Sequence, residues 1–411
     1  MVIHVLLFLG LYFEVFLLIT FLGERPRTEK LIQHTIRRYP SVSIIVPCYN
    51  EERTITKTIL SLLSLDYPED KLRIVVVNDG STDGSADMLA RFSSHPQVTI
   101  FHKENGGKHS ALNFALTYVQ TELVGGLDAD SFVDTRALKE MVPYFDEEKV
   151  MAVTPAIKIF EPRNVVQRIQ KAEYELSIFF RKTFAFLDGL LVTPGPLSIF
   201  RVTVFEELGG YRAAHNTEDF EIALRMQSNH YKIENAHRAH VYTVGPQTFK
   251  KLFKQRLRWT YGFIKNIMDY RHLYFKKRYG NFGMFILPLT TLSLFSALYF
   301  TVFFIISIVN RTLTKIVEFQ AVGLGLTGNF SFEWFYVNTQ SFLFLTYILA
   351  TLTFFLIIIG KKLGAEQRAL SFDIFYYLFL YGLIAPIWLT AAVYNAAFSR
   401  QTSWTGEKSV R

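Results

Sequence analysis

The chain has 411 residues, of which 50% are hydrophobic and 39 are Phe, and it carries a formal net charge of +8. This composition is too apolar for an ordinary soluble enzyme and too charged for a pure bundle of membrane helices, so we expect a mixed protein. Its single cysteine, Cys48, excludes an intramolecular disulfide and any site built from several thiolates. We expect Cys48 to pack as a small apolar side chain.

The N-terminal run from Val2 to Leu22 is long enough to cross a bilayer and has neither a basic start nor a small-residue cleavage site. We therefore expect residues 1–24 to form an uncleaved transmembrane anchor, in which Glu14 should face another helix or an interface. Basic residues follow this run, and ten Lys and Arg lie between Lys250 and Arg278. The positive-inside rule places the region between these clusters in the cytoplasm, and we expect no nucleic-acid partner for them.

Residues 40–250 are predicted to form an α/β domain with a doubly wound mixed sheet, because short β-branched runs alternate with segments of helical periodicity. The predicted elements are, in order, strand 42–46, helix 54–65, strand 74–77, strand 98–101, helix 108–119 and strand 123–127. In such sheets ligands bind beyond the carboxyl ends of the strands. Polar residues gather at these ends, namely Asn50, Glu51, Asp79, Asp128 and Asp130.

Asp128 and Asp130 directly follow a predicted strand, and residues two apart in extended chain project to the same side. Two carboxylates so placed can bind one hard divalent cation together with substrate phosphates. A turn with an Asx hydrogen bond explains the same residues without any ligand.

Two further motifs also have a structural and a functional interpretation. Gly106, Gly107 and Lys108 open a helix, where backbone amides and an ammonium can hold a diphosphate, although the same residues also make an ordinary loop. Asn216, Thr217, Glu218 and Asp219 precede an amphipathic run. The sequence alone favours an N-cap with acidic residues in the first turn, and the functional alternative makes Asp219 or Glu218 a general base.

Two amphipathic segments, Val165 to Leu187 and Leu252 to Tyr274, have basic faces and are predicted either as interfacial helices or as surface helices of the soluble domain. Thr193 to Pro196 is predicted as a rigid bend after the first of them. In the second, Gln255, Arg258 and Trp259 fall at i, i+3 and i+4, so an amide, a guanidinium and an indole share one helix face.

Three apolar segments follow, at about Phe282 to Val309, Gln340 to Gly360 and Phe372 to Phe398, and each is long enough to span a bilayer. Residues 251–281 then form an interfacial region, residues 282–400 the transmembrane part and residues 401–411 a tail. Three simple crossings leave the basic tail outside, against the positive-inside rule. A further crossing or a re-entrant piece between Ile316 and Val337 would resolve this conflict, and the sequence does not distinguish these arrangements from three simple crossings.

The ordered set of these motifs resembles the membrane-embedded family 2 glycosyltransferases, the processive synthases of cellulose, chitin, hyaluronan and poly-N-acetylglucosamine. The motifs are Pro47 to Glu51, Asn78 to Ser81, Gly106 to Lys108, Asp128 to Asp130, Thr217 to Asp219 and Gln255 to Trp259. The resemblance covers about residues 40 to 280, and it implies a GT-A-like catalytic domain with transmembrane and interfacial helices.

The resemblance also implies roles for individual residues. Asp79 with Pro47, Tyr49, Asn50 and Glu51 is expected to hold the uracil and ribose of a UDP-sugar, with Lys108 near the diphosphate. Asp130 with Asp128 is expected to bind Mg²⁺ or Mn²⁺. Asp219, beside Glu218, is expected to deprotonate the acceptor hydroxyl. Gln255, Arg258 and Trp259 are expected to hold the diphosphate and the terminal sugar of the growing chain.

Three functional hypotheses follow from these expectations. The first is a processive inverting enzyme of the plasma membrane that extends a β-linked polysaccharide from a UDP-sugar, with UDP-N-acetylglucosamine as the first choice. The second is a single-transfer glycosyltransferase acting on a lipid acceptor, which the Gln255 to Trp259 motif disfavours. The third is a transporter or scaffold with a degenerate nucleotide-binding domain. The sequence leaves open the linkage and the participation of a small accessory membrane subunit.

Overall fold

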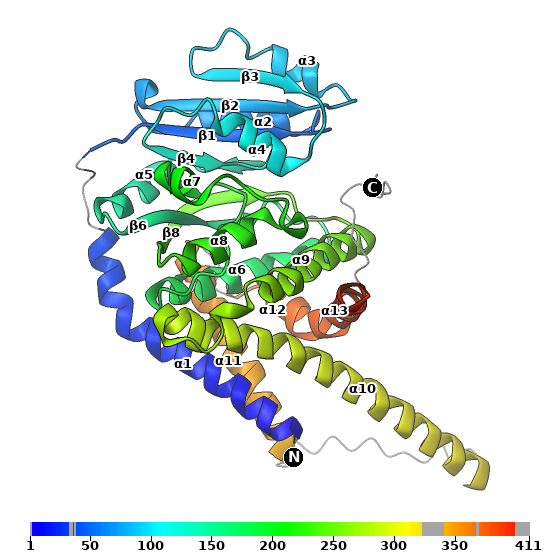
Figure 1. Cartoon of the computed structure of the whole chain (residues 1–411). Coiled ribbons are helices and arrows are strands. Elements are labelled where there is room, and N and C mark those ends of the chain that lie inside the picture. Colours follow the sequence, from blue (N-terminus) through cyan, green and yellow to red (C-terminus); the bar gives the residue numbers. More distant parts are fainter. Residues whose placement is uncertain (1, 33–35, 37, 323–340, 367–369, 399–411) are drawn as a thin grey trace.

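The computed structural model of the chain describes residues 2–32, 36, 38–322, 341–366 and 370–398. A sheet with helices on both faces occupies one end of the molecule, and long apolar helices occupy the other (Figure 1). Two amphipathic helices, α6 and α9, lie between these parts (Figure 1). The predicted tail, residues 401–411, lies outside the described residues.

The first half of the sheet is parallel, as predicted. Strand β2 pairs with both β1 and β3, and β4 pairs with the other edge of β1. These strands are β1 (Val42–Cys48), β2 (Leu72–Asp79), β3 (Val98–Lys103) and β4 (Leu123–Gly126), and the helices around them are α2 (Ile55–Leu63), η1 (Glu69–Lys71), α3 (Ser85–Ala90) and α4 (Lys108–Leu116). Their carboxyl ends therefore lie at one edge of the sheet.

The second half makes the sheet mixed. Its strands are β5 (Ser131–Val133), β6 (Val150–Ile159), β7 (Ile199–Arg201) and β8 (Lys232–Thr243), and its short helices are α5 (Ala137–Met141), η2 (Val142–Asp146), α7 (Thr203–Leu208), η3 (Ala214–Asn216) and α8 (Glu218–Ser228). Within the described residues the strand order is β3-β2-β1-β4-β7-β6-β8-β5. Strand β7 runs antiparallel to β4 and β6, so it joins the halves. The α/β fold with a mixed sheet that was predicted for this region is confirmed.

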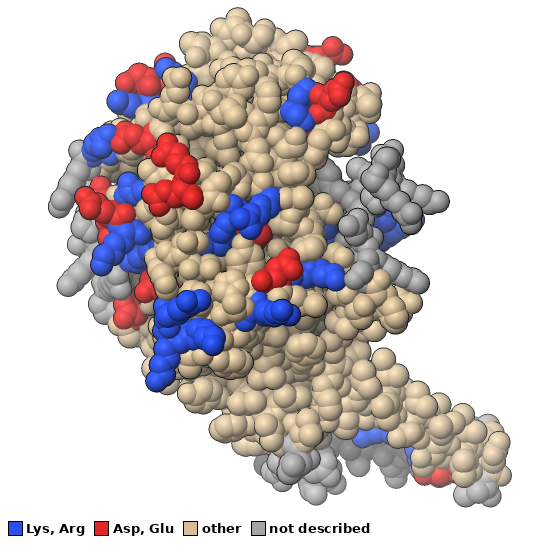
Figure 2. All heavy atoms as spheres, in the orientation of Figure 1, with Lys and Arg blue, Asp and Glu red and all other residues tan. Residues whose placement is uncertain are grey.

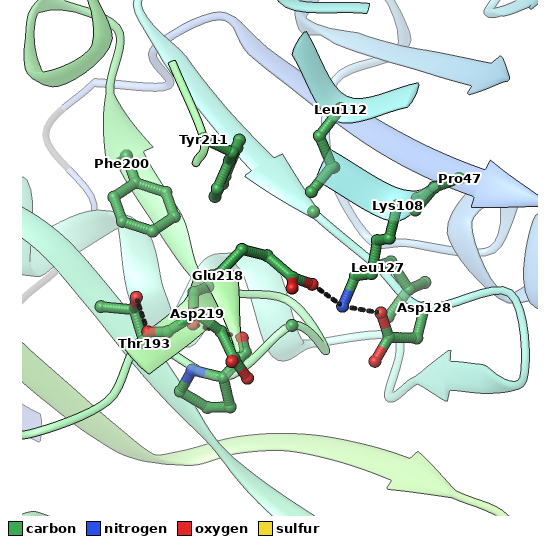
Figure 3. A pocket seen from close by; sticks show the side chains of 14 residues that line it. Pro47, Lys108, Leu112, Leu127, Asp128, Thr193, Phe200, Tyr211, Glu218 and Asp219 are labelled. Atoms are coloured by element: carbon green, nitrogen blue, oxygen red, sulfur yellow. Dashed lines mark hydrogen bonds and ion pairs between the residues drawn. The ribbon is translucent and has the colours of Figure 1, made fainter. Parts of the chain in front are cut away.

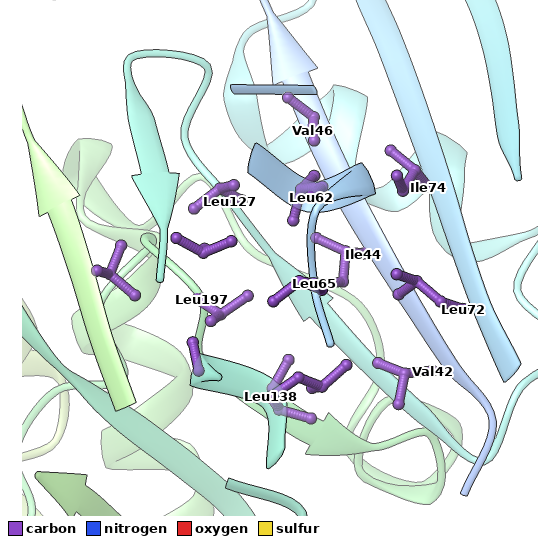
Figure 4. Packing of buried hydrophobic residues seen from close by; sticks show 14 of the residues in the cluster. Val42, Ile44, Val46, Leu62, Leu65, Leu72, Ile74, Leu127, Leu138 and Leu197 are labelled. Atoms are coloured by element: carbon purple, nitrogen blue, oxygen red, sulfur yellow. The ribbon is translucent and has the colours of Figure 1, made fainter. Parts of the chain in front are cut away.

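Two apolar cores cover the two faces of the sheet. Successive residues of β1 alternate between them, so Ile44 packs with α2 and α5 while Ile45 packs with α4 and α8. Figure 4 shows the first core, where Leu62 lies against Ile44 and Val46. Cys48 is fully buried in this core, as its expected role as a small apolar side chain requires. Because both faces are covered, the central residues of β1 and β2 are apolar almost without interruption.

Helix α6 (Val165–Phe186) and helix α9 (Phe249–Asp269) connect the sheet to the apolar helices. Helix α6 packs on β6 and β8 with one side and on the apolar helix α11 with the other, while α9 packs on α13. Each begins with a side-chain cap, Asn164 accepting from the Gln167 amide and Thr248 from the Lys251 amide. Neither helix is therefore an ordinary surface helix of the soluble domain.

Among the described residues, four helical stretches are long and apolar enough to cross a membrane, namely Val2–Glu24, Phe282–Gln320, Leu343–Leu363 and Phe372–Ala397. They belong to α1 (Val2–Ile32), the π-turn Phe282–Ile286 with α10 (Leu287–Val322), α11 (Ser341–Leu363), and α12 (Phe372–Tyr376) with the π-turn Tyr377–Tyr381 and α13 (Gly382–Ala397). The 3₁₀ turns η4 (Arg271–Leu273) and η5 (Lys277–Tyr279) lie between α9 and the second of these stretches. Figure 2 shows α10 almost free of charged side chains, whereas Lys and Arg gather above it.

The predicted spans agree with these helices. The region 316–337, where a further crossing was considered, divides into the end of α10 up to Val322 and residues outside the described ranges. Glu14 faces a neighbouring helix as expected, because Thr353 Oγ1 on α11 donates a 2.9 Å hydrogen bond to its Oε1.

A polar seam joins α6 to α11 and α12. Glu175 on α6 and Lys361 on α11 are 3% and 1% exposed at their side chains, and their charged atoms lie 3.5 Å apart. Asp373 on α12 pairs with Arg168 of α6 at 3.2 Å. Gly360 allows this close packing, since a Cβ there would overlap the backbone carbonyl of Glu175. The sheet and the apolar helices are thus held together by charge pairs as well as by apolar contacts.

Candidate active site

The loops that follow β1, β2 and β4 converge at one edge of the sheet, where the sequence predicted a site. The loop after β1 is tied to the loop after β2, because the Asn50 and Glu51 amides donate to Ser81 Oγ and Ser85 Oγ at 3.0 and 2.8 Å. Asn50 adopts a left-handed backbone with φ of 56° and accepts from the Thr82 amide at 2.8 Å. Pro47 and Tyr49 flank this turn and are partly exposed.

Asp79 ends β2 and organises the glycine loop. Its buried carboxylate accepts from Lys103 Nζ at 2.5 Å and from the Gly106 and Gly107 amides at 3.0 and 2.8 Å. Gly107 has φ of 84°, a conformation that favours glycine. The two amides that the sequence offered to a diphosphate are therefore bonded to Asp79, and they place Lys108 at the start of α4.

Lys108 lies at the centre of the opening drawn in Figure 3. Its Nζ lies 2.7 Å from Asp128 Oδ1 and 3.1 Å from Glu218 Oε1. Burial lowers the pKa of the ammonium, but the charges of Asp128 and Glu218 outweigh burial and hold the pKa well above its usual value. Gly195 makes room for this bridge, because a Cβ there would lie 2.6 Å from Lys108 Nζ. The bend at residues 193–196 that the sequence predicted thus has a steric purpose.

The opening around Lys108 encloses about 310 Å³, part of it open to solvent. Its lining joins residues that are distant in sequence: Pro47, Lys108, Leu112, Gly126, Leu127, Asp128, Thr193, Pro194, Gly195, Ser198, Phe200, Tyr211, Glu218 and Asp219. The sequence did not single out Thr193 or Tyr211 as site residues. The Thr-Pro-Gly-Pro bend was the available signal for Thr193, whereas no pattern distinguishes Tyr211 from core aromatic residues.

Asp128 and Asp130 lie in a turn between β4 and β5, closed by a 2.9 Å hydrogen bond from the Ser131 amide to the Asp128 carbonyl. The expectation of extended chain at these two residues is wrong, because β4 ends at Gly126. The carboxylates nevertheless influence each other. Burial, followed by the charges of Asp128 and Glu51, raises the pKa of Asp130 to about 7.

This arrangement fits a divalent cation in its donor chemistry, because carboxylates crowded in a buried site are stabilised by a hard cation. Among the described residues no group of three or more His, Cys, Asp or Glu forms a preformed metal cage. A cation at this place would therefore need ligands from a substrate, as Mg²⁺ bound by one or two carboxylates and phosphates does.

Glu218 and Asp219 are the first two residues of α8. Thr217 precedes them but makes no side-chain capping bond, so the predicted cap is wrong, whereas the acidic first turn is confirmed. The Asp219 carbonyl accepts from the amide and the hydroxyl of Thr193 at 3.1 and 3.0 Å. This pair of bonds attaches the start of α8 to the Thr193 bend.

The two adjacent carboxyls differ electrostatically. Burial, followed by the charge of Glu218, raises the pKa of Asp219. Burial also acts on Glu218, but Lys108 and the helix amide outweigh it and lower the pKa of Glu218. Of the two, Asp219 is thus the stronger proton acceptor, and Glu218 is the counterion of Lys108.

Gln255, Arg258 and Trp259 share one region of α9 and lie outside the lining drawn in Figure 3. Arg258 Nη1 donates a 2.7 Å hydrogen bond to the carbonyl of Asn216, two residues before Glu218. Gln255 Oε1 is buried and accepts no hydrogen bond from the described residues. The Trp259 ring lies 4.5 Å from the guanidinium of Arg256. The structure therefore places Arg258 near Glu218 and Asp219. It also places Trp259 against Arg256, which was not among the predicted site residues.

Arg256 is held from the α6 side. Its Nη2 lies 2.7 Å from Glu173 Oε2, and Tyr381 donates to Glu173 Oε1 at 3.0 Å. Burial lowers the pKa of Arg256, but Glu173 and neighbouring tyrosines outweigh burial and raise it. Trp259 is thus stacked on a guanidinium that is itself fixed by two other helices.

Residues 43–209 match the family model described as Glycosyl transferase family 2. The chain is 31% identical over 246 residues to a poly-beta-1,6-N-acetyl-D-glucosamine synthase of Staphylococcus epidermidis, covering 59% of each chain. It is also 31% identical over 262 residues to a beta-monoglucosyldiacylglycerol synthase of Nostoc, covering 62% of this chain and 55% of that one. The alignments therefore span less than two thirds of these relatives.

The fold is similar to that of a mannosyltransferase from Pyrobaculum calidifontis, solved in complex with GDP-Man and Mn²⁺. The TM-score is 0.54 at 18% identity, with 96% of this chain and 99% of that chain covered. At this identity the likeness concerns the fold alone, and it extends over the sheet region and the apolar helices.

Proposed function

We propose that this chain, which carries a glycosyltransferase family 2 domain, is a processive inverting glycosyltransferase that extends a β-linked polysaccharide from UDP-N-acetylglucosamine. The observation that carries the proposal is the junction at Lys108, whose ammonium joins Asp128 at a strand end to Glu218, beside Asp219. At this junction the Lys108 ammonium can bind a diphosphate, and the Asp219 carboxylate can accept a hydroxyl proton. The relatives named as poly-beta-1,6-N-acetyl-D-glucosamine synthases support the choice of polymer and donor.

The residues support a single displacement. The acceptor hydroxyl oxygen attacks the anomeric carbon from the face opposite the UDP, and the bond between that carbon and the diphosphate oxygen breaks. UDP leaves with the bonding electrons, and Asp219 takes the hydroxyl proton. The raised pKa of Asp219 suits this role, because a base is most effective when its pKa lies near the working pH. Lys108 and Arg258 supply positive charge for the diphosphate.

A divalent cation, Mg²⁺ or Mn²⁺, is part of the proposal, with Asp130 and Asp128 as its protein ligands. When bound, it would neutralise charge on the leaving diphosphate. Asp79 with the loop from Pro47 to Glu51 is assigned to the uridine. Gln255 and Trp259 are assigned to the acceptor, where an indole face matches the C–H face of a sugar ring.

The proposed organisation follows the ranges expected from the sequence. Residues 1–24 anchor the chain, residues 40–250 form a cytoplasmic catalytic domain, residues 251–281 lie at the interface, and residues 282–400 cross the bilayer and form the export path. The apolar outer surfaces of α1, α10 and α11 support contact with lipid. The participation of a small accessory membrane subunit stays open within this proposal.

The purified full chain, in detergent or nanodiscs with Mn²⁺ or Mg²⁺, is incubated with radiolabelled UDP-sugars one at a time. We expect label from UDP-N-acetylglucosamine to enter a product of high molecular weight that a hydrolase specific for its linkage degrades. Absence of incorporation from every UDP-sugar would overturn the proposed function.

A second function, single transfer to a lipid acceptor, has one observation in its favour. The relative named as a beta-monoglucosyldiacylglycerol synthase has the same 31% identity as the polysaccharide synthase. Product partition separates the two functions, because a glycolipid carrying one sugar extracts into organic solvent and a long polymer stays in water. Label found only in the organic phase would replace the first function by the second.

A further inference from the structure

The segment that precedes the acidic pair has an uncommon backbone. Ala214, His215 and Asn216 are three consecutive non-glycine residues with φ of 43°, 57° and 63°. Left-handed backbone is unfavourable for such residues, and a run of three persists only where surrounding contacts hold it. Thr217 follows, and then Glu218 and Asp219 begin α8. Whatever holds the run therefore also sets where these two carboxylates stand.

Helix α9 contacts every residue of this run. Asn266 Nδ2 donates to the Ala214 carbonyl at 3.2 Å, and Arg258 Nη1 donates to the Asn216 carbonyl at 2.7 Å. His215 Nε2 and Asp269 Oδ2 lie 3.0 Å apart. The run is thus attached to one helix at three successive residues.

Thr217 contacts α9 through both a hydrogen bond and close packing. Asn266 Nδ2 donates to Thr217 Oγ1 at 2.9 Å, and the same hydroxyl donates to the Ala214 carbonyl at 3.0 Å. Asn266 is 1% exposed, so these bonds are shielded from water. Gly262 admits the threonine, because a Cβ on Gly262 would overlap Thr217 Oγ1 and Cγ2 and lie 2.9 Å from Thr217 Cβ.

The residues of α9 that take part follow helical spacing. Arg258, Gly262 and Asn266 are at i, i+4 and i+8, so they form a stripe that continues from the Arg-Trp motif for two more turns. The exposed Met268 belongs to another face. The helix that carries the residues assigned to the diphosphate and the acceptor is therefore also the support of the carboxylate assigned as base.

We propose that Asn266 and Gly262 are positioning residues that act through Thr217 to hold Asp219 in its catalytic place. The inference rests on the proposed function, and it assigns to α9 a role beyond the Gln255 to Trp259 motif. Asn266 touches neither the opening nor its lining, so its effect is transmitted by the backbone of residues 214–217. A displacement of about 1 Å at a reacting group costs on the order of a hundredfold in rate.

Asn266→Ala and Gly262→Ala test the proposal in the full-length protein. We expect kcat for sugar transfer to fall about 10- to 100-fold, while KM for the UDP-sugar stays within about threefold, because the donor residues on β1, β2 and β4 are untouched. Met268→Ala serves as the matched control for Asn266. Gly382→Ala serves for Gly262, because a Cβ at this helical glycine meets nothing within 4 Å. Thr217→Ser keeps the hydroxyl and is expected to retain more activity than Thr217→Val.

Hydrogen exchange provides a readout that does not depend on catalysis. Asn266→Ala is expected to speed exchange of the amides from Thr217 to Glu221 relative to Met268→Ala, whether or not the protein transfers sugar. Unchanged exchange would overturn the proposed role of Asn266 in holding residues 214–217. Normal kcat in both α9 variants, in a protein that makes polymer, would overturn the positioning role and leave the proposed function standing. A wild-type chain inactive with every donor would instead refute the function.

Discussion

Exchanging the two adjacent carboxyls of α8 for amides separates the base from the counterion. Asp219→Asn removes the proposed proton acceptor and retains the shape of the side chain. Glu218→Gln removes one of two carboxylates around Lys108 and leaves Asp128, 2.7 Å away, in place. We expect the first change to lower the rate of polymer synthesis far more than the second.

The magnitudes follow from the surroundings of each group. A positioned base contributes about 10²- to 10⁴-fold, which corresponds to about 3–5 kcal/mol in the barrier, so Asp219→Asn should lower kcat by that factor. Glu218→Gln replaces a charged hydrogen-bond acceptor by a neutral one while Lys108 keeps Asp128. We expect a loss of about tenfold, seen mainly as a raised KM for the donor.

The pH dependence has a definite sign. Asp219 acts as a base only when ionised, and burial with the charge of Glu218 raises its pKa above that of an ordinary aspartate. Activity should therefore fall on acidification at a higher pH than an exposed aspartate would produce. Glu218→Gln removes the neighbouring negative charge, so the acid limb should move to lower pH.

Initial rates with radiolabelled UDP-N-acetylglucosamine, measured from pH 5 to 9, distinguish the roles of Asp219 and Glu218. Thermal unfolding of each variant checks that it is folded. Full polymer synthesis by Asp219→Asn would refute the assignment of the base. A larger kcat loss in Glu218→Gln than in Asp219→Asn would reverse the two roles.

Three further changes probe other parts of the molecule. Gly195→Ala should lower transfer about 10- to 100-fold at an unchanged melting temperature, because the new Cβ would lie 2.6 Å from Lys108 Nζ, and a normal rate would refute this steric argument. Lys361→Met removes the nearer of two lysines that face the buried carboxylate of Glu175 and leaves Lys171 at 3.7 Å, so it should destabilise the chain by up to about 3–5 kcal/mol in thermal unfolding, with Glu175→Gln in the same chain restoring most of the loss. Cys48 should resist thiol reagents at pH 8 until the chain unfolds, because burial raises its pKa to about 11, and rapid labelling of the native protein would contradict its place in the core.

The first half of the sheet was predictable because its strands are short β-branched runs that the fold covers on both faces. Strands β6 and β8 escaped prediction because they include buried polar residues. In β8, Glu234, Asn235 and His237 are all buried. Asn235 Nδ2 donates to Thr154 Oγ1 of β6 at 3.1 Å. This partner on the neighbouring strand allows Asn235 to be buried, although an asparagine in a sequence is usually predicted to be exposed.

The site was predictable to the level of which loops meet, and no further. The rule that ligands bind beyond strand ends predicted that the loops carrying Asn50, Asp79 and Asp128 lie at one edge of the sheet, where the structure has them. It could not show that Asp79 bonds the Gly106 and Gly107 amides, because that contact depends on the path of a loop after a different strand. Nor could it show that Asp128 lies in a turn, since the end of β4 at Gly126 is set by pairing with β1 and β7.

The contacts of α9 connect the proposed chemistry to the membrane helices. On one side, Arg258 holds the Asn216 carbonyl next to the acidic pair. On another, Trp259 stacks on Arg256, which is fixed through Glu173 to Tyr381 at the start of the last apolar helix. A shift of that apolar helix along its axis would therefore be transmitted through α9. It would move the indole of Trp259, assigned to the acceptor, together with the carboxylate of Asp219, assigned as base. In the processive enzyme that we propose, such a coupling would keep Trp259 and Asp219 in register while the polymer advances.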